Sequence, residues 1–136
     1  MKVQIDDGAY APTRAHGTDA GMDLRAPADV LISAHGSAVI RTGVHVQLPA
    51  GHCGLLISRS GLNVRFGITS RGLIDEGYTG EIQVRLDNSG DTYYQVHAGE
   101  KISQLVVVPC RYEPIELVDQ IEGGERGDAG FGSTGR

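Results

Sequence analysis

A carboxylate and an aromatic ring stand three positions apart in the glycine-rich stretch GLIDEGYTG at residues 72–80. Asp75 could act as a general base toward water, which is the task of a carboxylate in hydrolysis. Tyr78 adds an apolar ring with a polar tip. Glycines in such a stretch supply the backbone conformations of a tight β-hairpin turn. We therefore predict a hairpin that presents both side chains to a cleft, although the pattern also fits an ordinary surface turn.

A second candidate site follows the apolar run at residues 53–58. Arg59, Ser60 and Gly61 combine a guanidinium, a hydroxyl and a residue that lets backbone approach a ligand closely. If a helical turn follows, these groups and the backbone N–H groups form a cradle for phosphate. The alternative is a strand end with an exposed arginine, because three residues make a weak motif.

The last residues hold a third set of groups that suit a planar, phosphorylated ligand. Phe131 stands among glycines, with Arg126 before it and Ser133 and Thr134 after it. A flexible arm of this composition could stack its ring on a base and place its polar groups on phosphates. A plain disordered terminus is the competing interpretation.

Two further polar residues lie in segments that otherwise favour strands. Asp23 could bind a metal ion directly or through water, although Asp19 or Asp29 would serve equally on spacing alone. Gln104 interrupts the apolar run of residues 101–109, so a buried amide there would need a partner. Its alternative is a sheet edge that faces water.

Short alternating or apolar segments along the chain predict the strands that position these groups. Only residues 63–67 suit a helical turn, and Gly43 suggests a bulge. About ten short strands in one domain predict an all-β jelly roll or sandwich. The strands are expected at residues 2–5, 20–26, 30–32, 38–48, 53–58, 81–86, 92–97, 101–109 and 112–118.

Composition narrows the class of protein. The formal charge of −5 at pH 7 argues against a nucleic-acid binder, and no apolar run approaches the length of a membrane span. Arginine strongly outnumbers lysine, and its planar fork suits phosphate oxygens. Cys53 and Cys110 show no zinc-site spacing, and the N-terminal residues lack the apolar run of a secretory signal. We therefore expect a cytoplasmic protein with reduced cysteines.

Segments in a fixed order over nearly the whole chain resemble the five-motif signature of the trimeric dUTP diphosphatase (dUTPase) family. They read AGMDL at residues 20–24, SRSGL at 58–62, GLIDEGYTGE at 72–81, GEKISQL at 99–105 and RGDAGFGSTG at 126–135. The resemblance implies a jelly-roll fold, a β-clip-like distorted barrel, over residues 1–122. It also implies a mobile glycine-rich arm at residues 123–136 and a homotrimer whose active sites are shared between chains.

The implied activity is an enzyme of nucleotide metabolism. It hydrolyses dUTP to dUMP and pyrophosphate by attack of water at the α-phosphorus, with Mg²⁺ held by the triphosphate. This reaction keeps uracil out of DNA and supplies dUMP for thymidylate synthesis. Carried over to this sequence, Asp75 is the catalytic residue that activates water, and Tyr78 packs under the deoxyribose where a 2′-OH would stand. Asp23 supports the metal ion through water.

The family's substrate site also implies roles for other positions. The backbone around residues 72–75 reads uracil, and Phe131 stacks on the base. Thr69 stands where many relatives place an asparagine that touches the base. The substrate-binding residues implied in this way are Arg59, Ser60, Gly61, Thr69, Gly72, Leu73, Ile74, Tyr78, Gln83, Gln104, Arg126, Phe131, Gly132, Ser133 and Thr134.

Two alternative functions are compatible with the same fold. One is a dCTP deaminase-like enzyme, although such chains are longer and carry catalytic residues beyond these motifs. The other is a regulatory binding protein that retains the fold, although Asp75, Tyr78 and the arm are all present. The partners that we predict are dUTP and further copies of the chain, with neither nucleic acid nor membrane.

Overall fold

A computed structural model of the chain describes residues 1–124 and residue 127. Its regular structure consists of strands and one short helix, so the all-β prediction is confirmed. In chain order the elements are β1 (Lys2–Ile5), β2 (Gly21–Arg25), β3 (Val30–Ile32), β4 (Ser37–Gln47), β5 (His52–Ile57), α1 (Ser60–Phe66), β6 (Ile68–Thr69), β7 (Arg71–Ile74), β8 (Glu81–Asn88), β9 (Tyr94–Val96) and β10 (Lys101–Pro109).

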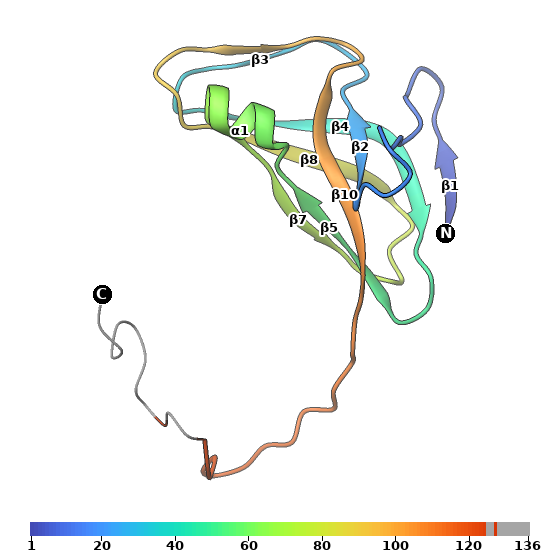
Figure 1. The fold of residues 1–136 in the computed structure, drawn as a ribbon, viewed down its shortest axis with the longest axis vertical. Coiled ribbons are helices and arrows are strands. Elements are labelled where there is room, and N and C mark those ends of the chain that lie inside the picture. Colours follow the sequence, from blue (N-terminus) through green and yellow to red (C-terminus); the bar gives the residue numbers. More distant parts are fainter. Residues whose placement is uncertain (125–126, 128–136) are drawn as a thin grey trace.

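Two four-stranded sheets and a two-stranded ribbon make up the domain (Figure 1). The first sheet has the strand order β1-β4-β8-β6, the second has the order β2-β10-β5-β7, and β3 pairs with β9. Every strand pair is antiparallel, as in jelly-roll proteins. Within the described residues the two sheets remain separate hydrogen-bonded units, so they do not close into one barrel.

The core lies between these sheets and follows from the alternation of the sequence. Along β8, Ile82, Val84 and Leu86 are fully buried, while Gln83 and Arg85 between them are exposed. Because successive side chains of a strand point to opposite faces, this pattern fixes which face meets the core. Burying one such aliphatic side chain contributes about 1.5–3 kcal/mol. Packing in the core therefore fixes the position of the strands that carry the candidate site.

Local signals predicted most elements correctly. The bulge in β4 is confirmed, because the pairing with β8 shifts register between Arg41 and His45, and Gly43 has φ 66°. The helix begins earlier than expected and ends where Gly67 adopts a left-handed conformation. α1 is seven residues long, and no helix in the described part of the chain is long and apolar enough to cross a membrane.

The predicted last strand at residues 112–118 is wrong. The described chain forms no helix or strand after Pro109, and Figure 1 shows this segment running away from the sheets. Its apolar residues alternate as in a strand, yet Ile115 and Leu117 are 91% and 94% exposed. A strand needs a neighbour for its backbone hydrogen bonds. No strand among the described residues pairs with this segment.

The predicted hairpin at residues 72–81 also differs from expectation. β7 pairs with β5 and β8 pairs with β4, so the strands that flank the turn belong to different sheets. β7 is an edge strand, and β6 covers the other side of β8 only at Asp87 and Asn88. The facing edges of β7 and of β8 before Asp87 therefore keep backbone groups that no strand of the described chain pairs.

Candidate active site

The unpaired edges of β7 and β8 border a pocket of about 360 Å³. Backbone N–H and C=O groups along such edges can bind a flat polar ligand, as they would bind a further strand. Predicted site residues line this pocket together with one residue that was not predicted, Glu81. The lining residues are Leu73, Ile74, Asp75, Tyr78, Glu81 and Gln83.

Tyr78 is folded back across its own turn. Its backbone N–H donates to the carbonyl of Asp75 at 3.0 Å, and its hydroxyl donates to the carbonyl of Glu81 at 2.9 Å. The ring approaches Gly80 so closely that a Cβ there would lie 2.6 Å from ring carbon Cζ. Glycine at position 80 therefore permits this ring position. With 44% of the residue exposed, the ring forms an accessible wall of the pocket.

Glu81 ties the turn to β4. Its carboxylate accepts hydrogen bonds from Arg41 Nε at 2.7 Å and from the backbone N–H of Gly43 at 2.9 Å. Burial alone would raise the pKa of Glu81, but the bonds from Gly43 and Arg41 outweigh it and hold the pKa below its ordinary value. The β4 bulge thus supplies a donor that fixes one end of the turn.

His45 holds the same turn through its ring. Nδ1 lies 3.1 Å from the carbonyl of Thr79, and Nε2 lies 3.3 Å from a carboxylate oxygen of Asp6. Both ring nitrogens face acceptors, so both contacts are hydrogen bonds only when the ring is protonated. The bond to Thr79 and then the bond to Asp6 raise the pKa of His45. Asp6 and Glu81 are the charged groups that act on this ring.

We expect His45 to stabilise the folded protein most strongly at acidic pH. Because its pKa is raised on folding, the contribution is fully present below the ordinary value of about 6.5 and is lost as pH rises through the folded value. The stability difference between the wild type and His45→Gln, measured by denaturation from about pH 5 to 9, should therefore shrink as pH rises. A difference that stays constant or grows would contradict this assignment.

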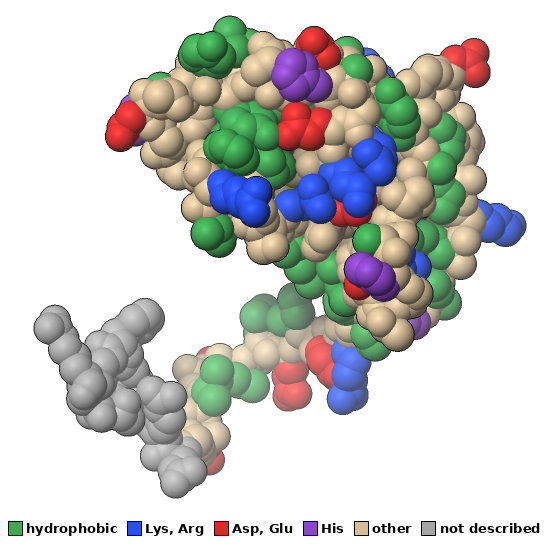
Figure 2. Space-filling view, turned by 45° about the horizontal axis from the view of Figure 1, so that its top comes forward, with side chains coloured by type: hydrophobic (Ala, Val, Ile, Leu, Met, Phe, Trp, Pro, Cys, Tyr) green, Lys and Arg blue, Asp and Glu red, His purple; other side chains and the backbone are tan. Residues whose placement is uncertain are grey.

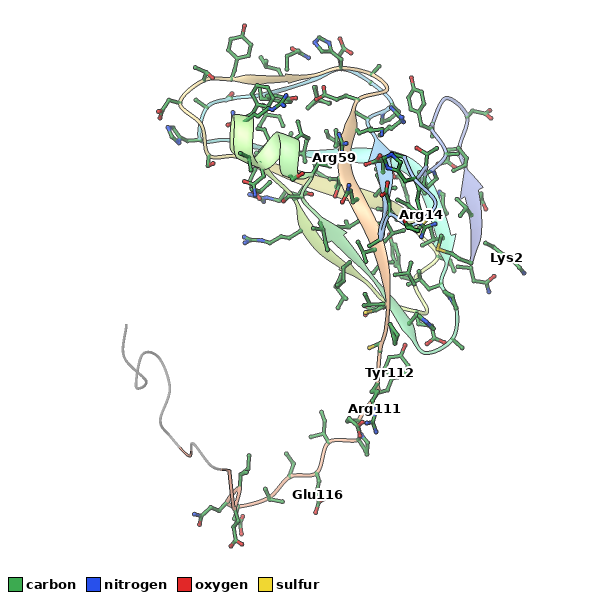
Figure 3. The ribbon with its side chains drawn as sticks, in the orientation of Figure 1. Lys2, Arg14, Arg59, Arg111, Tyr112 and Glu116 are labelled. Atoms are coloured by element: carbon green, nitrogen blue, oxygen red, sulfur yellow. The ribbon has the colours of Figure 1, made fainter. Side chains whose placement is uncertain are left out.

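A second group of predicted residues lies where β2, β10 and the start of α1 meet. Asp23 on β2 lies opposite Gln104 on β10. Arg59 Nε lies 3.1 Å from Asp23 Oδ1, and Lys101 Nζ lies 2.6 Å from Asp23 Oδ2. We call these four residues the Asp23 cluster. Figure 3 shows Arg59 between α1 and β10. In Figure 2, where the top of Figure 1 is turned toward the viewer, Lys and Arg side chains gather on one face of the molecule.

Gln104 lies in a central strand of its sheet. β10 pairs with β2 on one side and with β5 on the other, so the alternative of a sheet edge is wrong. The side chain lies over Gly21, where a Cβ would stand 2.9 Å from Gln104 Oε1. Ser60 and Gly61 begin α1 beside the cluster, and both are exposed. The predicted phosphate-binding groups of the described chain thus come from neighbouring elements.

The surroundings of Asp23 limit how it could support a metal ion. Its side chain is 6% exposed and pairs with two cations. Oδ1 has no hydrogen-bond partner in the described part of the chain, because Arg59 Nε is close to it but not aligned. No group of three or more His, Cys, Asp or Glu side chains among the described residues could hold a metal ion. Since Mg²⁺ keeps several waters and binds phosphates, these surroundings fit only an indirect role for Asp23, and its Oδ1 is closed to solvent as the cluster stands.

One chain keeps the two groups of residues apart. Ile74 lies opposite Gly54 at the start of β5, whereas Arg59 follows the other end of that strand. At about 3.3 Å per residue over the positions from 54 to 59, Asp75 and Arg59 lie roughly 15 Å apart along the strand. Asp75 and Arg59 of one chain therefore lie at opposite ends of β5.

The remaining predicted residues lie in neither group. Thr69 on β6 lies opposite Asp87 and lines another hollow, of about 560 Å³, with Arg71 and Arg85. Gly72 lies on β7, where a Cβ would stand 3.0 Å from the Leu56 side chain. The arm residues lie outside the described residues, so their roles remain predictions. These residues are Arg126, Phe131, Gly132, Ser133 and Thr134.

Lys101 is, with Glu81, a site residue that sequence reasoning missed. It stands within GEKISQL, and lysine is otherwise found only at position 2. That rarity was the available signal, but its contact with Asp23 depends on the pairing of two strands that are distant in sequence.

Comparison with known proteins identifies the family. The dUTPase family model matches residues 7–135. The chain belongs to the dUTPase family. A relative from Clostridium acetobutylicum, named deoxyuridine 5'-triphosphate nucleotidohydrolase, is 41% identical over 139 residues, which covers 99% of this chain and 96% of the relative. A relative of the same name from Clostridium kluyveri is 42% identical and covers 97% of this chain and 94% of its own length.

Solved structures of dUTPases have the same fold. The dUTPase of Staphylococcus bacteriophage 80alpha, solved with dUpNHpp, has a TM-score of 0.92 at 32% identity and covers 99% of this chain and 98% of its own. A variant dUTPase from phage phi11 of S. aureus, which reveals the coordination of a structural Mg(II) ion, has a TM-score of 0.82 at 29% identity. It covers 90% of this chain and 98% of its own. The predicted jelly-roll fold and family are both confirmed.

Proposed function

We propose that this member of the dUTPase family hydrolyses dUTP to dUMP and pyrophosphate. The pocket between the unpaired edges of β7 and β8, with Asp75 and Tyr78 in its lining, is the observation that carries the proposal. Relatives at about 40% identity are named for action on the same nucleotide. The reaction would keep uracil out of DNA and supply dUMP for thymidylate synthesis.

The base is proposed to lie between the two strand edges. Uracil carries two carbonyl oxygens and one ring N–H on its pairing edge, which match backbone groups near Leu73 and Gln83. Because both strands are held by the core, these donors and acceptors are fixed before the base arrives. A base with a different pattern of donors and acceptors would leave buried polar groups unpaired. This can lower kcat/KM for that nucleotide by a factor of about 10⁴.

The sugar is proposed to rest on Tyr78. The ring is held at its hydroxyl by the carbonyl of Glu81 and lies tightly against Gly80. A ring fixed in this way cannot move aside for an added 2′-OH. Tyr78 would therefore favour a deoxyribonucleotide over a ribonucleotide.

Asp75 is proposed to activate the attacking water. The carboxylate is exposed at the pocket and takes a proton as the water oxygen bonds to the α-phosphorus. The bond from the α-phosphorus to its bridging oxygen breaks, and pyrophosphate leaves with the electron pair. Positioning and charge stabilisation supply most of the acceleration in such reactions. When bound, Mg²⁺ would neutralise charge on the phosphates, and Asp23 would support it through water.

The phosphates are proposed to lie against the Asp23 cluster of a neighbouring chain. Arg59 and Lys101 carry two positive charges against the one negative charge of Asp23, so the cluster keeps a net positive charge. Ser60 and Gly61 offer a hydroxyl and an approachable backbone beside it. These groups would hold the β- and γ-phosphates while Asp75 of another chain serves the α-phosphate.

We also propose a homotrimer with shared active sites. The distance between Asp75 and Arg59 within a chain argues for two chains at each site. Beyond β10, Ile115, Leu117 and Ile121 are 91%, 94% and 88% exposed, a degree of apolar exposure that favours contact with another copy. Light scattering should give the mass of three chains, and a monomer at working concentration would contradict the proposal.

The arm and the location complete the proposal. Residues 123–136 would close over a site of the trimer, with Phe131 on uracil and Arg126, Ser133 and Thr134 on the phosphates. Removal of this arm should lower activity while the trimer remains. Activity assays and light scattering together would test this.

A cytoplasmic location is proposed because both cysteines are free, and fractionation of the source cells would check it.

We expect Gly80→Ala to weaken the choice between deoxyribose and ribose. The added Cβ would lie 2.6 Å from the ring of Tyr78, so the ring must move. The ratio of kcat/KM for dUTP over UTP should fall about tenfold. Gly77→Ala is the matched control, because a Cβ at position 77 in the same turn meets nothing within 4 Å. Equal ratios in both variants would show that Tyr78 does not read the sugar.

The function is tested by pyrophosphate release with Mg²⁺ from dUTP, dTTP, dCTP and UTP. We expect dUTP to react at least about 100-fold faster than the other nucleotides. Ammonia release from dCTP is measured in parallel, since it would support a deaminase. A pure, folded protein that releases no pyrophosphate from dUTP would leave the binding-protein alternative.

A further inference from the structure

The turn that carries Asp75 is also held from outside the pocket between β7 and β8, which we call the dUTP pocket. Glu76 Oε2 accepts hydrogen bonds from the backbone N–H of Gly51 at 2.8 Å and from the hydroxyl of Tyr112 at 2.6 Å. These contacts line a second hollow, of about 560 Å³, which shares Asp75 and Leu73 with the dUTP pocket but not Tyr78. One carboxylate oxygen therefore joins the turn to two other segments.

Asp75 depends on this attachment because its own carboxylate has none. In the described part of the chain, its carbonyl accepts a bond from Tyr78, but no hydrogen bond or ion pair holds its side chain. The position of the carboxylate is thus set by the backbone of the turn. Glu76 is the next residue, so its two bonds fix the peptide unit adjacent to Asp75.

The donors to Glu76 are themselves joined. The backbone N–H of Cys110 donates to the carbonyl of Gly51 at 2.7 Å, and Gly51 has φ 70° in the turn before β5. Tyr112 lies where the chain leaves the sheets (Figure 3). Residues 75–80, the turn at residues 49–51 and the start of the C-terminal segment therefore meet at one point.

The protonation states make this attachment strong near neutral pH. The bond from Tyr112, followed by the bond from Gly51, holds the pKa of Glu76 below its ordinary value. The same carboxylate raises the pKa of Tyr112 to about 12. The pair is therefore a carboxylate with a neutral phenol donor, and hydrogen bonds to an ionised acceptor are roughly twice as strong as neutral ones.

We propose that Glu76 is a positioning residue for the hydrolysis of dUTP. It holds the Asp75 carboxylate in place relative to the α-phosphate, and it ties that placement to the start of the segment that leads to the arm. This inference rests on the proposed dUTPase activity. It assigns Glu76 no contact with substrate, and it makes Tyr112 a partner of the catalytic turn.

The test compares Glu76→Ala, Tyr112→Phe and the double variant in the full-length protein. We expect Glu76→Ala to lower kcat about tenfold, since small displacements of a catalytic group cost this much or more, while KM stays within about threefold. Tyr112→Phe should lower kcat about threefold, and the double variant should match Glu76→Ala, because both changes break the same contact. Glu113→Gln is the control: it neutralises an exposed acid of the same segment, paired with Arg111, and should retain wild-type kcat.

A purely structural role predicts a different outcome. If Glu76→Ala lowers the melting temperature but keeps wild-type kcat, or if the two changes act additively, the inference is overturned. Glu76→Gln retains the shape of the side chain and one acceptor oxygen, so its kcat should lie between those of the wild type and Glu76→Ala. If Glu76→Ala does not fold, Glu76→Gln takes its place in the comparison. A folded wild type that does not hydrolyse dUTP would overturn the proposed function itself and this inference with it.

Discussion

Replacing Asp75 with asparagine should lower kcat for dUTP about 1000-fold while the nucleotide still binds. Asparagine keeps the size of the side chain and its hydrogen bonding, but it cannot take a proton from water at neutral pH. Loss of a negative charge beside a triphosphate does not weaken its binding. Steady-state pyrophosphate release gives kcat, and calorimetric titration with a non-hydrolysable analogue gives the affinity.

The control for this variant is Asp7→Asn, which changes the net charge equally at an exposed position outside the pocket lining. It should retain wild-type kcat. An Asp75→Asn protein that turns over dUTP within about tenfold of the wild type would remove Asp75 as the general base.

Mixing variants tests whether sites are shared between chains. Asp75→Asn and Arg59→Ala subunits are each expected to be poorly active alone. In mixed trimers, some sites take Asp75 from an Arg59→Ala chain and Arg59 from an Asp75→Asn chain. Those sites contain both wild-type residues, so activity should return. If trimers shown to be mixed recover no activity, the proposal that these residues act from different chains is wrong.

Replacing Lys101 with methionine should lower the free energy of unfolding by about 3 kcal/mol. The change leaves Asp23 buried, with its Oδ2 deprived of the ammonium that lies 2.6 Å away. Arg59 Nε stays 3.1 Å from Oδ1 but is not aligned for a hydrogen bond with it, so its charge offsets the loss only in part. A buried carboxylate that loses one of its cations costs far more than an exposed one.

Lys2→Met is the matched control, since Lys2 is exposed and is the other lysine of the chain. Chemical denaturation at a fixed protein concentration gives both values, because association adds to the apparent stability. We expect the control to lie within about 0.5 kcal/mol of the wild type. Equal stability of the two variants would mean that Lys101 does not stabilise Asp23.

Sequence patterns predicted most strands that bury one face in the core, although β6, with its buried Ile68, was not among them. The alternation in β8 and the bulge at Gly43 in β4 are local signals, and the structure retains both. The segment at residues 112–118 carries the same kind of alternation without forming a strand. Its failure has a physical cause: apolar alternation marks a face that can be buried, but pairing also requires a neighbouring strand.

The sequence indicated which residues line the candidate site better than it indicated how the fold arranges them. Asp75, Tyr78 and Gln83 share a pocket, as expected for one site. The sequence could not indicate that β7 and β8 belong to different sheets, because pairing depends on where β4 and β5 lie. For the same reason, the contacts of Lys101 with Asp23 and of Tyr112 with Glu76 join residues that only the folded chain brings together.

A crystal structure with the α,β-imido analogue of dUTP is the most direct test of the account. We predict uracil bonded to backbone groups of β7 and β8, deoxyribose on Tyr78, and phosphates on Arg59 and Lys101 of a neighbouring chain. The Asp75 carboxylate should bind a water about 3 Å away, in line with the α-phosphorus. A base bound outside the β7–β8 pocket, or an Asp75 carboxylate turned away from the α-phosphate, would contradict the account.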